Sequence, residues 1–455
     1  MNYAQAEKML KSCGQEHVLA YWKKLSKKEQ AALLEQIATI EPKSVRQCRA
    51  ALGVGVENGC RKESENQDGK APKVAELKGA ALKKAIAAGE KELKAGRVAA
   101  LLVAGGQGSR LGYDGPKGCY SIGPITGAPL FYFHARKILA RSVRYGKPIP
   151  FYVMTSEANN AATVACFEEH NYFGLDPKDV FFFTQGMWPG MTKDGKIILD
   201  APGHVFMSPD GHGGLIAALK RSGALADMKK RGIKSVFFFQ VDNPLVEIAD
   251  PAFIGYHVRQ KSEYTLKLCA KRDPYEKVGM PMAFTAKGVT QYRMVEYTEM
   301  TDEQCNRKAK DGELYFKYGS PAIHVFDRAF LEREAGKDMP LHLAFKKIPT
   351  VVDGKVVKPS EPNGYKFEKF IFDILPNAKT AAFMAFEQKD EFSPVKNAEG
   401  SDSPETCKAD MQAKWARWFA KLGVKIPRNL PLELDPVYAL DASDLRSLGL
   451  WLAAD

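Results

Sequence analysis

The stretch from Leu101 to Gly118 reads LLVAGGQGSRLGYDGPKG, an apolar strand-like run followed by a loop rich in glycine. Because glycine has no Cβ atom, several backbone N–H groups in such a loop can point the same way and form a nest for an anion. Arg110 adds forked hydrogen bonds and Lys117 adds a mobile positive charge, and both suit a polyphosphate. We therefore expect a phosphate-binding loop after a buried strand, although a glycine-rich turn without a ligand would have the same outline.

The spacing of residues in this loop does not match either of two common nucleotide-binding motifs. A Walker A loop closes with Gly-Lys-Ser/Thr, but Leu111 stands five residues after Gly106 and no Lys-Ser/Thr pair follows. A dinucleotide fingerprint needs GxGxxG, and Gly106 and Gly108 supply only its first two glycines. A nicotinamide oxidoreductase is further disfavoured because no ribose-binding acid follows on a later strand.

The surrounding chain predicts the fold class. Four apolar runs bounded by turn residues have the pattern of buried strands: VAALLVAGG from Val98, IPFYVMTS from Ile149, VFFFTQG from Val180 and SVFFFQVDN from Ser235. Helical patterns lie between them, at residues 130–145 and 215–231. This alternation predicts an α/β fold with a doubly wound, mixed but mainly parallel sheet, whose ligands bind beyond the carboxyl ends of its strands.

The flanking regions predict a three-part organisation. Residues 1 to about 60 have helical periodicity, residues 60–75 are polar and linker-like, and AALKKAIAAGEKELKAG is a helix that ends at Gly96. Beyond residue 260, YTLKLCAKRD, YRMVEYTEM, ELYFKYGSPAIHVF and KFEKFIFDIL look like strands of a mixed sheet, and a helix is expected from Met411. We expect a helical N-terminal segment (1–95), a catalytic domain (96–400) and a small C-terminal domain (401–455).

Composition restricts the function classes. The 455-residue chain carries a formal net charge of +12, but its Lys and Arg residues are spread along helical faces beside Glu, which indicates a solvated surface rather than a nucleic-acid site. Eight scattered cysteines without a CxxC pair favour free thiols. Without a membrane-length apolar run or a signal-peptide core near Met1, we expect a cytoplasmic protein that binds neither membrane nor nucleic acid. The oligomeric state stays open.

The loop motif VAGGQGSRLG followed by PKG resembles the signature of the sugar nucleotidylyltransferases. Further stretches resemble the eukaryotic-type UDP-sugar pyrophosphorylases, most closely those specific for UDP-N-acetylglucosamine: QEHVLAYW, FGLDPKDVFFFTQGMWPGM, VDNPLVEIADPAFIGY, RMVEYTEM, KPSEPNGYKFEKFIFDIL and DEFSPVKNA, spanning Gln15 to Ala398. The resemblance implies a nucleotide-diphospho-sugar transferase fold. It also implies a Mg²⁺-dependent uridylyltransferase that makes a UDP-sugar and pyrophosphate from UTP and a hexose 1-phosphate.

Residues for the phosphates and the metal come from three stretches. Asp242 follows an apolar strand, where a carboxylate suits Mg²⁺ but could equally form an Asx turn or a helix cap, and the resemblance implies the metal role. The resemblance also implies that Lys396 of FSPVKNA reaches the phosphates with Arg110 and Lys117. The nucleotide would lie against the bare backbone of the loop glycines, which are Gly105, Gly106 and Gly108.

The base and the sugar are assigned by resemblance as well. The Gln185 amide offers a donor and an acceptor that match the uracil edge, and Gly211 would place its backbone against the ring. Glu296 and Phe370 match family positions that contact the sugar. No catalytic triad is required, because the phosphate of the sugar is already an anionic nucleophile.

Two positions depart from the N-acetylglucosamine pattern. His212 in SPDGHGG and Ser320 in KYGSPAIHVF stand where those enzymes carry sugar-contacting Asn residues, and the GHG sequence resembles the UDP-glucose enzymes. Drift within one specificity would give the same departures. We therefore expect glucose 1-phosphate as the substrate, with N-acetylglucosamine 1-phosphate as the first alternative and a non-catalytic sugar-nucleotide sensor as the second.

Overall fold

The computed structural model describes residues 1–54, 69–427 and 429–447. Most of the linker expected at residues 60–75 and the end of the chain therefore lie outside the described residues. Contacts divide the chain into two compact units: unit 1 takes residues 1–65, 185–215 and 338–373, and unit 2 takes residues 66–184, 216–337 and 374–455. Unit 1 is thus assembled from three separate stretches. The division at residues 95 and 400 stays a prediction.

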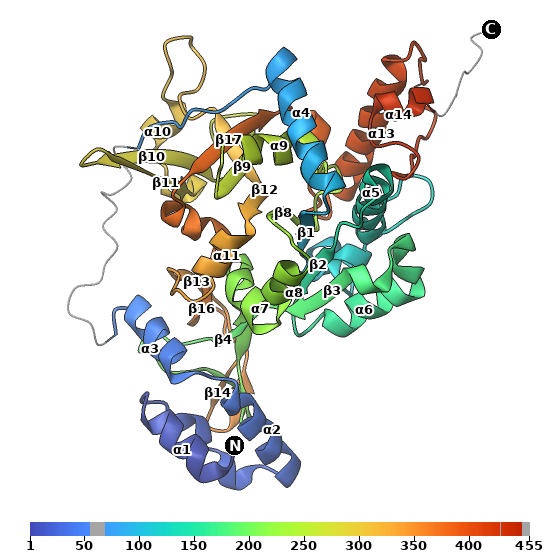
Figure 1. Cartoon of the computed structure of the whole chain (residues 1–455). Coiled ribbons are helices and arrows are strands. Elements are labelled where there is room, and N and C mark those ends of the chain that lie inside the picture. The colour runs from blue at the N-terminus through green and yellow to red at the C-terminus, as the bar shows by residue number, and fades with distance from the viewer. Residues whose placement is uncertain (55–68, 428, 448–455) are drawn as a thin grey trace. The chain divides into compact units, whose positions relative to one another are not determined.

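Unit 2 contains a seven-stranded sheet (Figure 1). Its strand order is β17 (Ala381–Phe386), β9 (Tyr264–Ala270), β12 (Tyr318–Asp327), β8 (Ser235–Gln240), β1 (Val98–Val103), β2 (Phe151–Thr155) and β3 (Val180–Thr184). β12 runs antiparallel to both of its neighbours, and the other pairs are parallel. The four apolar runs of the sequence therefore form the consecutive parallel strands β8, β1, β2 and β3.

Helices cover both faces of this sheet. Ala100, Phe151 and Phe237 are in register across β1, β2 and β8, and they share a buried core with four helices: α4 (Gly79–Lys94), α5 (Leu130–Tyr145), α6 (Asn160–Glu169) and α9 (Pro251–Arg259). On the opposite face, the Tyr152 hydroxyl donates a hydrogen bond to Asp227 of α8 (Ala224–Lys230) at 2.6 Å. The doubly wound, mainly parallel α/β fold is confirmed.

Several predicted elements differ in detail. The helix expected over residues 215–231 is broken into α7 (Leu215–Arg221) and α8, because Gly223 adopts a left-handed φ of 83° between them. The strand expected at YRMVEYTEM forms a separate hairpin, β10 (Met280–Ala286) with β11 (Val289–Val295). KFEKFIFDIL is only partly a strand, because β16 (Gly364–Glu368) ends before a 3₁₀ turn that contains Pro376.

The N-terminal residues of unit 1 pack on a group of short hairpins. The elements are α1 (Tyr3–Lys11), α2 (Lys27–Ala38), α3 (Pro42–Ala51), β4 (Met187–Pro189) with β7 (Met207–Pro209), β5 (Leu199–Ala201) with β6 (His204–Val205), β13 (His342–Lys346) with β16, and β14 (Thr350–Val352) with β15 (Lys355–Val357). Apolar residues of the helices and hairpins form one core. The Gln15 amide joins them, since it donates to the Gly195 carbonyl and accepts from the Ile197 N–H, both at 2.8 Å.

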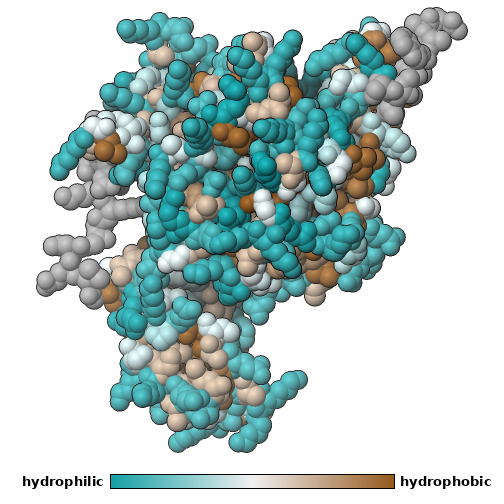
Figure 2. All heavy atoms as spheres, viewed as in Figure 1, coloured by the Kyte–Doolittle hydropathy of each residue, from teal (hydrophilic) through white to brown (hydrophobic). Residues whose placement is uncertain are grey.

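The C-terminal helices belong to unit 2. α13 (Pro404–Ala420) begins before the expected Met411, and α14 (Ala442–Ser447) follows it. Trp415 and Met411 share a buried cluster with Phe133 of α5 and with Leu111 of the glycine loop. No helix in the described part of the chain is long and apolar enough to cross a membrane. Hydrophilic residues cover most of the face drawn in Figure 2.

Candidate active site

The glycine loop folds back on itself directly after β1. The Gly108 N–H donates to the Gly115 carbonyl at 2.9 Å, and the Lys117 N–H donates to the Gly106 carbonyl at 3.1 Å. Among the described residues, the N–H groups of Gly105 and Gly106 have no hydrogen-bond partner. The loop therefore holds Lys117 beside two free amide donors, which is the arrangement that an anion-binding nest needs.

Glycine is required at different positions of the loop for different reasons. A Cβ on Gly108 would lie 2.7 Å from the Tyr113 ring, and one on Gly118 would lie 2.1 Å from the Phe131 ring, so both positions are closed by packing. A Cβ on Gly106 would meet no atom within 4 Å. Gly106 is thus bare toward open space, where a ligand can approach the backbone.

Lys117 and Asp242 lie together at neighbouring strand ends. Val103 and Gln240, the last residues of β1 and β8, are paired in the sheet, so the two following loops start side by side. Lys117 Nζ lies 3.7 Å from Asp242 Oδ2, and both side chains are 15% exposed. A cation and a carboxylate with this limited exposure stand at the edge where ligands bind in open α/β sheets.

Lys396 reaches the same edge through the segment that precedes it. The Val395 N–H donates to the Asp242 carbonyl at 2.8 Å, which places the two functional loops in contact. The Lys396 ammonium itself lies 3.9 Å from Asp402 and is 40% exposed. Arg110 is exposed on a 3₁₀ turn, and its side chain makes no hydrogen bond or ion pair with another described residue. Arg110 is therefore available to a ligand, whereas Lys396 is partly exposed beside Asp402.

Ser320 and Glu296 both lie close to Gly279. The Ser320 N–H donates to the Gly279 carbonyl at 2.9 Å, and a Cβ on Gly279 would lie 3.3 Å from Glu296 Oε1. Ser320 sits in the bulge at the start of β12, where Ala322 has a φ of 60°. Because β12 is antiparallel to β8, this bulge is at the same sheet edge as Asp242.

The remaining predicted residues lie in unit 1. Buried Gln185 precedes Gly186, and a Cβ on Gly186 would lie 2.4 Å from the Asp210 carboxylate. Gly211 has a φ of 79°, and a Cβ there would lie 2.5 Å from the Lys369 carbonyl, so only glycine fits. Gln185 precedes β4 and Gly211 follows β7. Because Met187 pairs with Pro209, both residues lie at the same end of this two-stranded sheet.

His212 and Phe370 form a ring stack in unit 1. Their planes lie 10° apart with centroids 5.2 Å apart, and the His342 ring covers Phe370 with centroids 4.0 Å apart. Desolvation lowers the pKa of His212 to about 4, so the ring is neutral at physiological pH. The Ile371 N–H donates to His212 Nδ1 at 3.1 Å, which leaves the ring proton on Nε2. His212 is therefore a hydrogen-bond donor at Nε2.

Sequence reasoning missed three supporting residues. Asn159 donates to the carbonyls of Ala104 at 2.9 Å and Gly106 at 3.3 Å and so braces the glycine loop. His342 and Asp373 are 2.8 Å apart and hold the ring stack. The glycine loop had a motif to find, but these residues act through contacts between distant segments, and none of them stands in a recognisable local pattern.

The site fits a metal ion that is shared with phosphates. In the described part of the chain, no group of three or more His, Cys, Asp or Glu side chains could hold a metal. Mg²⁺ usually keeps several waters and binds through one or two carboxylates together with substrate phosphates. One carboxylate, Asp242, beside an open phosphate loop is consistent with that mode and not with an all-protein metal cage.

Comparisons with known proteins identify relatives over most of the chain. The family described as UTP–glucose-1-phosphate uridylyltransferase matches residues 60–402. The chain is 37% identical to UDP-N-acetylhexosamine pyrophosphorylase-like protein 1 of Homo sapiens, covering 91% of this chain and 85% of that protein. It is 36% identical to the UDP-N-acetylglucosamine pyrophosphorylase of Saccharomyces cerevisiae, covering 92% of each.

A solved structure extends the likeness to the fold. The uridine diphosphate N-acetylglucosamine pyrophosphorylase of Trypanosoma brucei, in complex with an inhibitor, superposes with a TM-score of 0.83 at 28% identity and covers 97% of this chain and 93% of that one. The glycine loop, the paired strand ends and these near-full-length relatives lead to one conclusion. The chain belongs to the UTP–glucose-1-phosphate uridylyltransferase family, the UDP-sugar pyrophosphorylases.

Proposed function

We propose that this uridylyltransferase makes UDP-N-acetylglucosamine and pyrophosphate from UTP and N-acetylglucosamine 1-phosphate, with Mg²⁺. The observation that carries the reaction class is the 3.7 Å pair of Lys117 and Asp242 beside the free amides of the glycine loop. The acetylated sugar is favoured because relatives that match nearly the whole chain are named as UDP-N-acetylhexosamine or UDP-N-acetylglucosamine pyrophosphorylases.

The glucose 1-phosphate expected from the sequence has less support than this alternative. That expectation rested on His212 and Ser320 replacing two Asn residues. His212, however, keeps a donor at Nε2, and a donor can serve the carbonyl oxygen of an acetamido group as well as a hydroxyl. His212 is therefore compatible with the N-acetylated substrate.

The reaction needs placement and charge relief rather than a general base. The sugar phosphate oxygen is already anionic, so the protein must align it with the α-phosphorus of UTP and offset the repulsion between two phosphorylated substrates. In our proposal Lys117 and Arg110 offset that charge, and the amides of Gly105 and Gly106 bind phosphate oxygens. Lys396 follows Val395, which is hydrogen-bonded to Asp242, and in our proposal its ammonium offsets negative charge on the departing pyrophosphate.

We assign the other predicted residues to binding of the base and the sugar. Gln185 reads the uracil edge with the Gly211 backbone beside it, and both are fixed by the hairpin that ends at Asp210. In our proposal His212 and Phe370, which the ring stack holds together, contact the sugar. The sugar-contacting roles of Glu296 and Ser320 stay predictions from the resemblance. Asp242 would hold the Mg²⁺, which when bound supplies charge neutralisation at the phosphates.

A pyrophosphate-release assay tests the proposal. Purified protein is incubated with UTP, Mg²⁺ and one sugar 1-phosphate at a time: N-acetylglucosamine, N-acetylgalactosamine, glucose or galactose 1-phosphate. We expect kcat/KM for N-acetylglucosamine 1-phosphate to exceed that for glucose 1-phosphate by at least about 10-fold, the scale of one pocket contact. EDTA should abolish the signal.

Two results would contradict the proposal in different ways. A preference for glucose 1-phosphate would restore the expectation from His212 and Ser320. UDP-sugar binding, measured by calorimetry, without pyrophosphate release from any sugar would indicate a non-catalytic sensor.

A further inference from the structure

Helix α13 lies outside the part of the chain that the family match covers, yet it is built into the loops that carry the candidate active site. The match ends at residue 402, and α13 spans Pro404–Ala420. It makes polar contacts both to the loop after Asp242 and to the segment before Lys396. Nothing in the comparisons assigns a role to this helix.

Lys414 of α13 holds the loop that begins at Asp242. Its ammonium donates to the Leu245 carbonyl at 3.2 Å and pairs with the Glu247 carboxylate. The Lys414 side chain is only 7% exposed, so removing it would leave the buried Leu245 carbonyl without this donor and the Glu247 carboxylate with Arg141 as its remaining ion-pair partner. The contact is therefore a strong restraint on residues 245–247.

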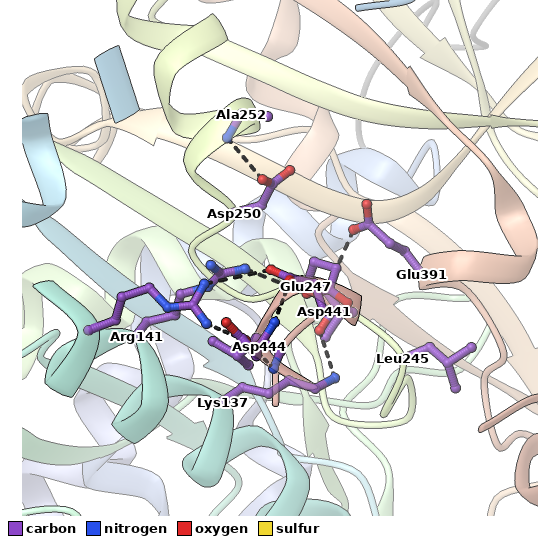
Figure 3. Close-up of polar contacts among 12 residues, drawn as sticks. Lys137, Arg141, Leu245, Glu247, Asp250, Ala252, Glu391, Asp441 and Asp444 are labelled. Carbon is purple, nitrogen blue, oxygen red and sulfur yellow. Dashed lines mark hydrogen bonds and ion pairs between the residues drawn. The ribbon is translucent and has the colours of Figure 1, made fainter. Parts of the chain in front are cut away.

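Helix α5 holds the same loop from another side (Figure 3). The Lys137 ammonium donates to the carbonyls of Pro244 and Val246, the latter at 2.8 Å, and Arg141 lies 3.7 Å from Glu247. Burial alone would raise the pKa of Glu247, but Lys414, Lys137 and Arg141 outweigh it and lower the pKa to about 2. Glu247 therefore stays ionised and keeps the helices and the loop together.

Helix α13 also forms hydrogen bonds with the segment that leads to Lys396. The Cys407 thiol donates to the Ser393 carbonyl at 3.0 Å, and the Ser393 hydroxyl donates to Asp410 at 2.7 Å. Two residues later, the Val395 N–H donates to the Asp242 carbonyl. Helix α13 thus contacts both segments, and the Val395–Asp242 hydrogen bond joins the two segments directly.

We propose that α13 is a positioning element of the active site, in which Lys414 fixes the Asp242 loop and Cys407 with Asp410 fixes the Lys396 segment. The inference rests on the proposed function, because it takes Asp242 as the metal ligand and Lys396 as a phosphate ligand. Lys414 is a positioning residue, since it acts only through the loop. Residues that orient a metal ligand typically change metal affinity or activity by about 10- to 100-fold when they are replaced.

The test compares two variants of α13 in the full-length protein. Lys414→Met removes the ammonium and keeps an unbranched apolar side chain that is one atom shorter, and Lys421→Met removes an exposed lysine at the end of the same helix. Ser393→Ala is a milder third variant that loses only the hydroxyl contact with Asp410. Each is measured for thermal stability, kcat, the Mg²⁺ concentration for half-maximal rate, and amide hydrogen exchange by mass spectrometry without ligands.

For Lys414→Met we expect faster exchange in peptides covering residues 241–250, kcat lower by about 10- to 100-fold, and a higher Mg²⁺ requirement. Ser393→Ala should speed exchange over residues 391–397 and lower kcat by a smaller factor. Lys421→Met should match the wild type. A purely structural role would lower the melting temperature without changing the Mg²⁺ requirement of the folded enzyme.

Wild-type exchange in both segments of Lys414→Met, or faster exchange with unchanged kcat, would overturn the proposal. If Lys414→Met does not fold, Ser393→Ala decides, and wild-type exchange and kcat in that variant would overturn it as well. If the wild type itself releases no pyrophosphate from any sugar, the proposed function fails. The exchange measurements then still decide whether α13 restrains the two segments.

Discussion

Gly106 and Gly118 belong to the same loop but serve different purposes. Gly118 is required by packing, because any Cβ would enter the Phe131 ring. Gly106 faces open space and has a free N–H among the described residues. The difference separates a glycine that the fold needs from one that a ligand needs.

Gly106→Ala should therefore weaken nucleotide binding without destabilising the protein. We expect the free energy of unfolding to stay within about 0.5 kcal/mol of the wild type, as for other substitutions that meet no neighbour. The KM for UTP should rise about 10-fold, because a methyl group then stands where the phosphates approach the backbone. Gly118→Ala is the matched control and should lower the melting temperature. A Gly106→Ala enzyme with wild-type KM would show that the nucleotide does not approach this backbone.

At this scale the sequence predicts the residues that follow strands and misses those that brace them. Lys117 and Asp242 each stand directly after an apolar run or its glycine loop, so a local pattern locates them. Asn159 and Lys414 act on loops that lie far from them along the chain. Their positions depend on tertiary packing, which no local pattern encodes.

Among the elements, α4 and α9 pack with their backbones in direct contact. A Cβ on Gly255 would lie 1.7 Å from the Ala85 carbonyl oxygen, and one on Gly89 would lie 1.9 Å from the Pro251 carbonyl oxygen. α9 begins directly after Asp250, at the end of the loop that Asp242 opens. The close approach of the two helices therefore fixes where this loop ends.

Gly255→Ala should destabilise the protein by about 3 kcal/mol or more, because the helices must separate to admit the methyl group. Urea unfolding measures the change, and Lys84→Ala, at an exposed position of α4, is the control. A Gly255→Ala protein as stable as the wild type would mean that α4 and α9 do not pack this closely.

The strands were predictable and the helix boundaries less so. The four apolar runs formed β1, β2, β3 and β8, because long buried strands of a parallel sheet are apolar throughout. The beginning of α13 was missed, because PETCKAD has no apolar periodicity. Its helix is started instead by the Ser403 capping box.

At the scale of the whole molecule, stability should depend on pH through the buried ion cluster around Glu247. Its folded-state pKa of about 2 lies below the ordinary value of 4.5, so the charged form contributes stability above about pH 4.5. That contribution disappears as the pH falls toward 2. The shift corresponds to at most about 3 kcal/mol.

Glu247→Gln isolates this contribution. We expect the variant to melt well below the wild type at pH 6–7, and the gap to narrow steadily as the pH falls below 4.5, because a protonated Glu247 resembles Gln. Differential scanning calorimetry at several pH values from 7 to 3.5 measures the gap. A gap that does not change with pH would exclude an ionised Glu247 as its source.

The two-unit organisation was beyond sequence reasoning. Residues 185–215 and 338–373 interrupt the chain of unit 2 and join the N-terminal residues. Their short hairpins have ordinary strand patterns, and nothing in those patterns says which core they complete. Gln15 shows the difficulty, because its partners Gly195 and Ile197 lie far along the chain.

The most direct test of the account is the turnover of Lys117→Ala with saturating UTP, N-acetylglucosamine 1-phosphate and Mg²⁺, measured as pyrophosphate release. If Lys117 and the glycine loop hold the phosphates beside Asp242, turnover should fall by about 10²- to 10³-fold, the effect of losing one preorganised electrostatic donor. Lys147→Ala, at an exposed position, should be unaffected. Turnover of Lys117→Ala within about threefold of the wild type would contradict the phosphate-binding role of this loop.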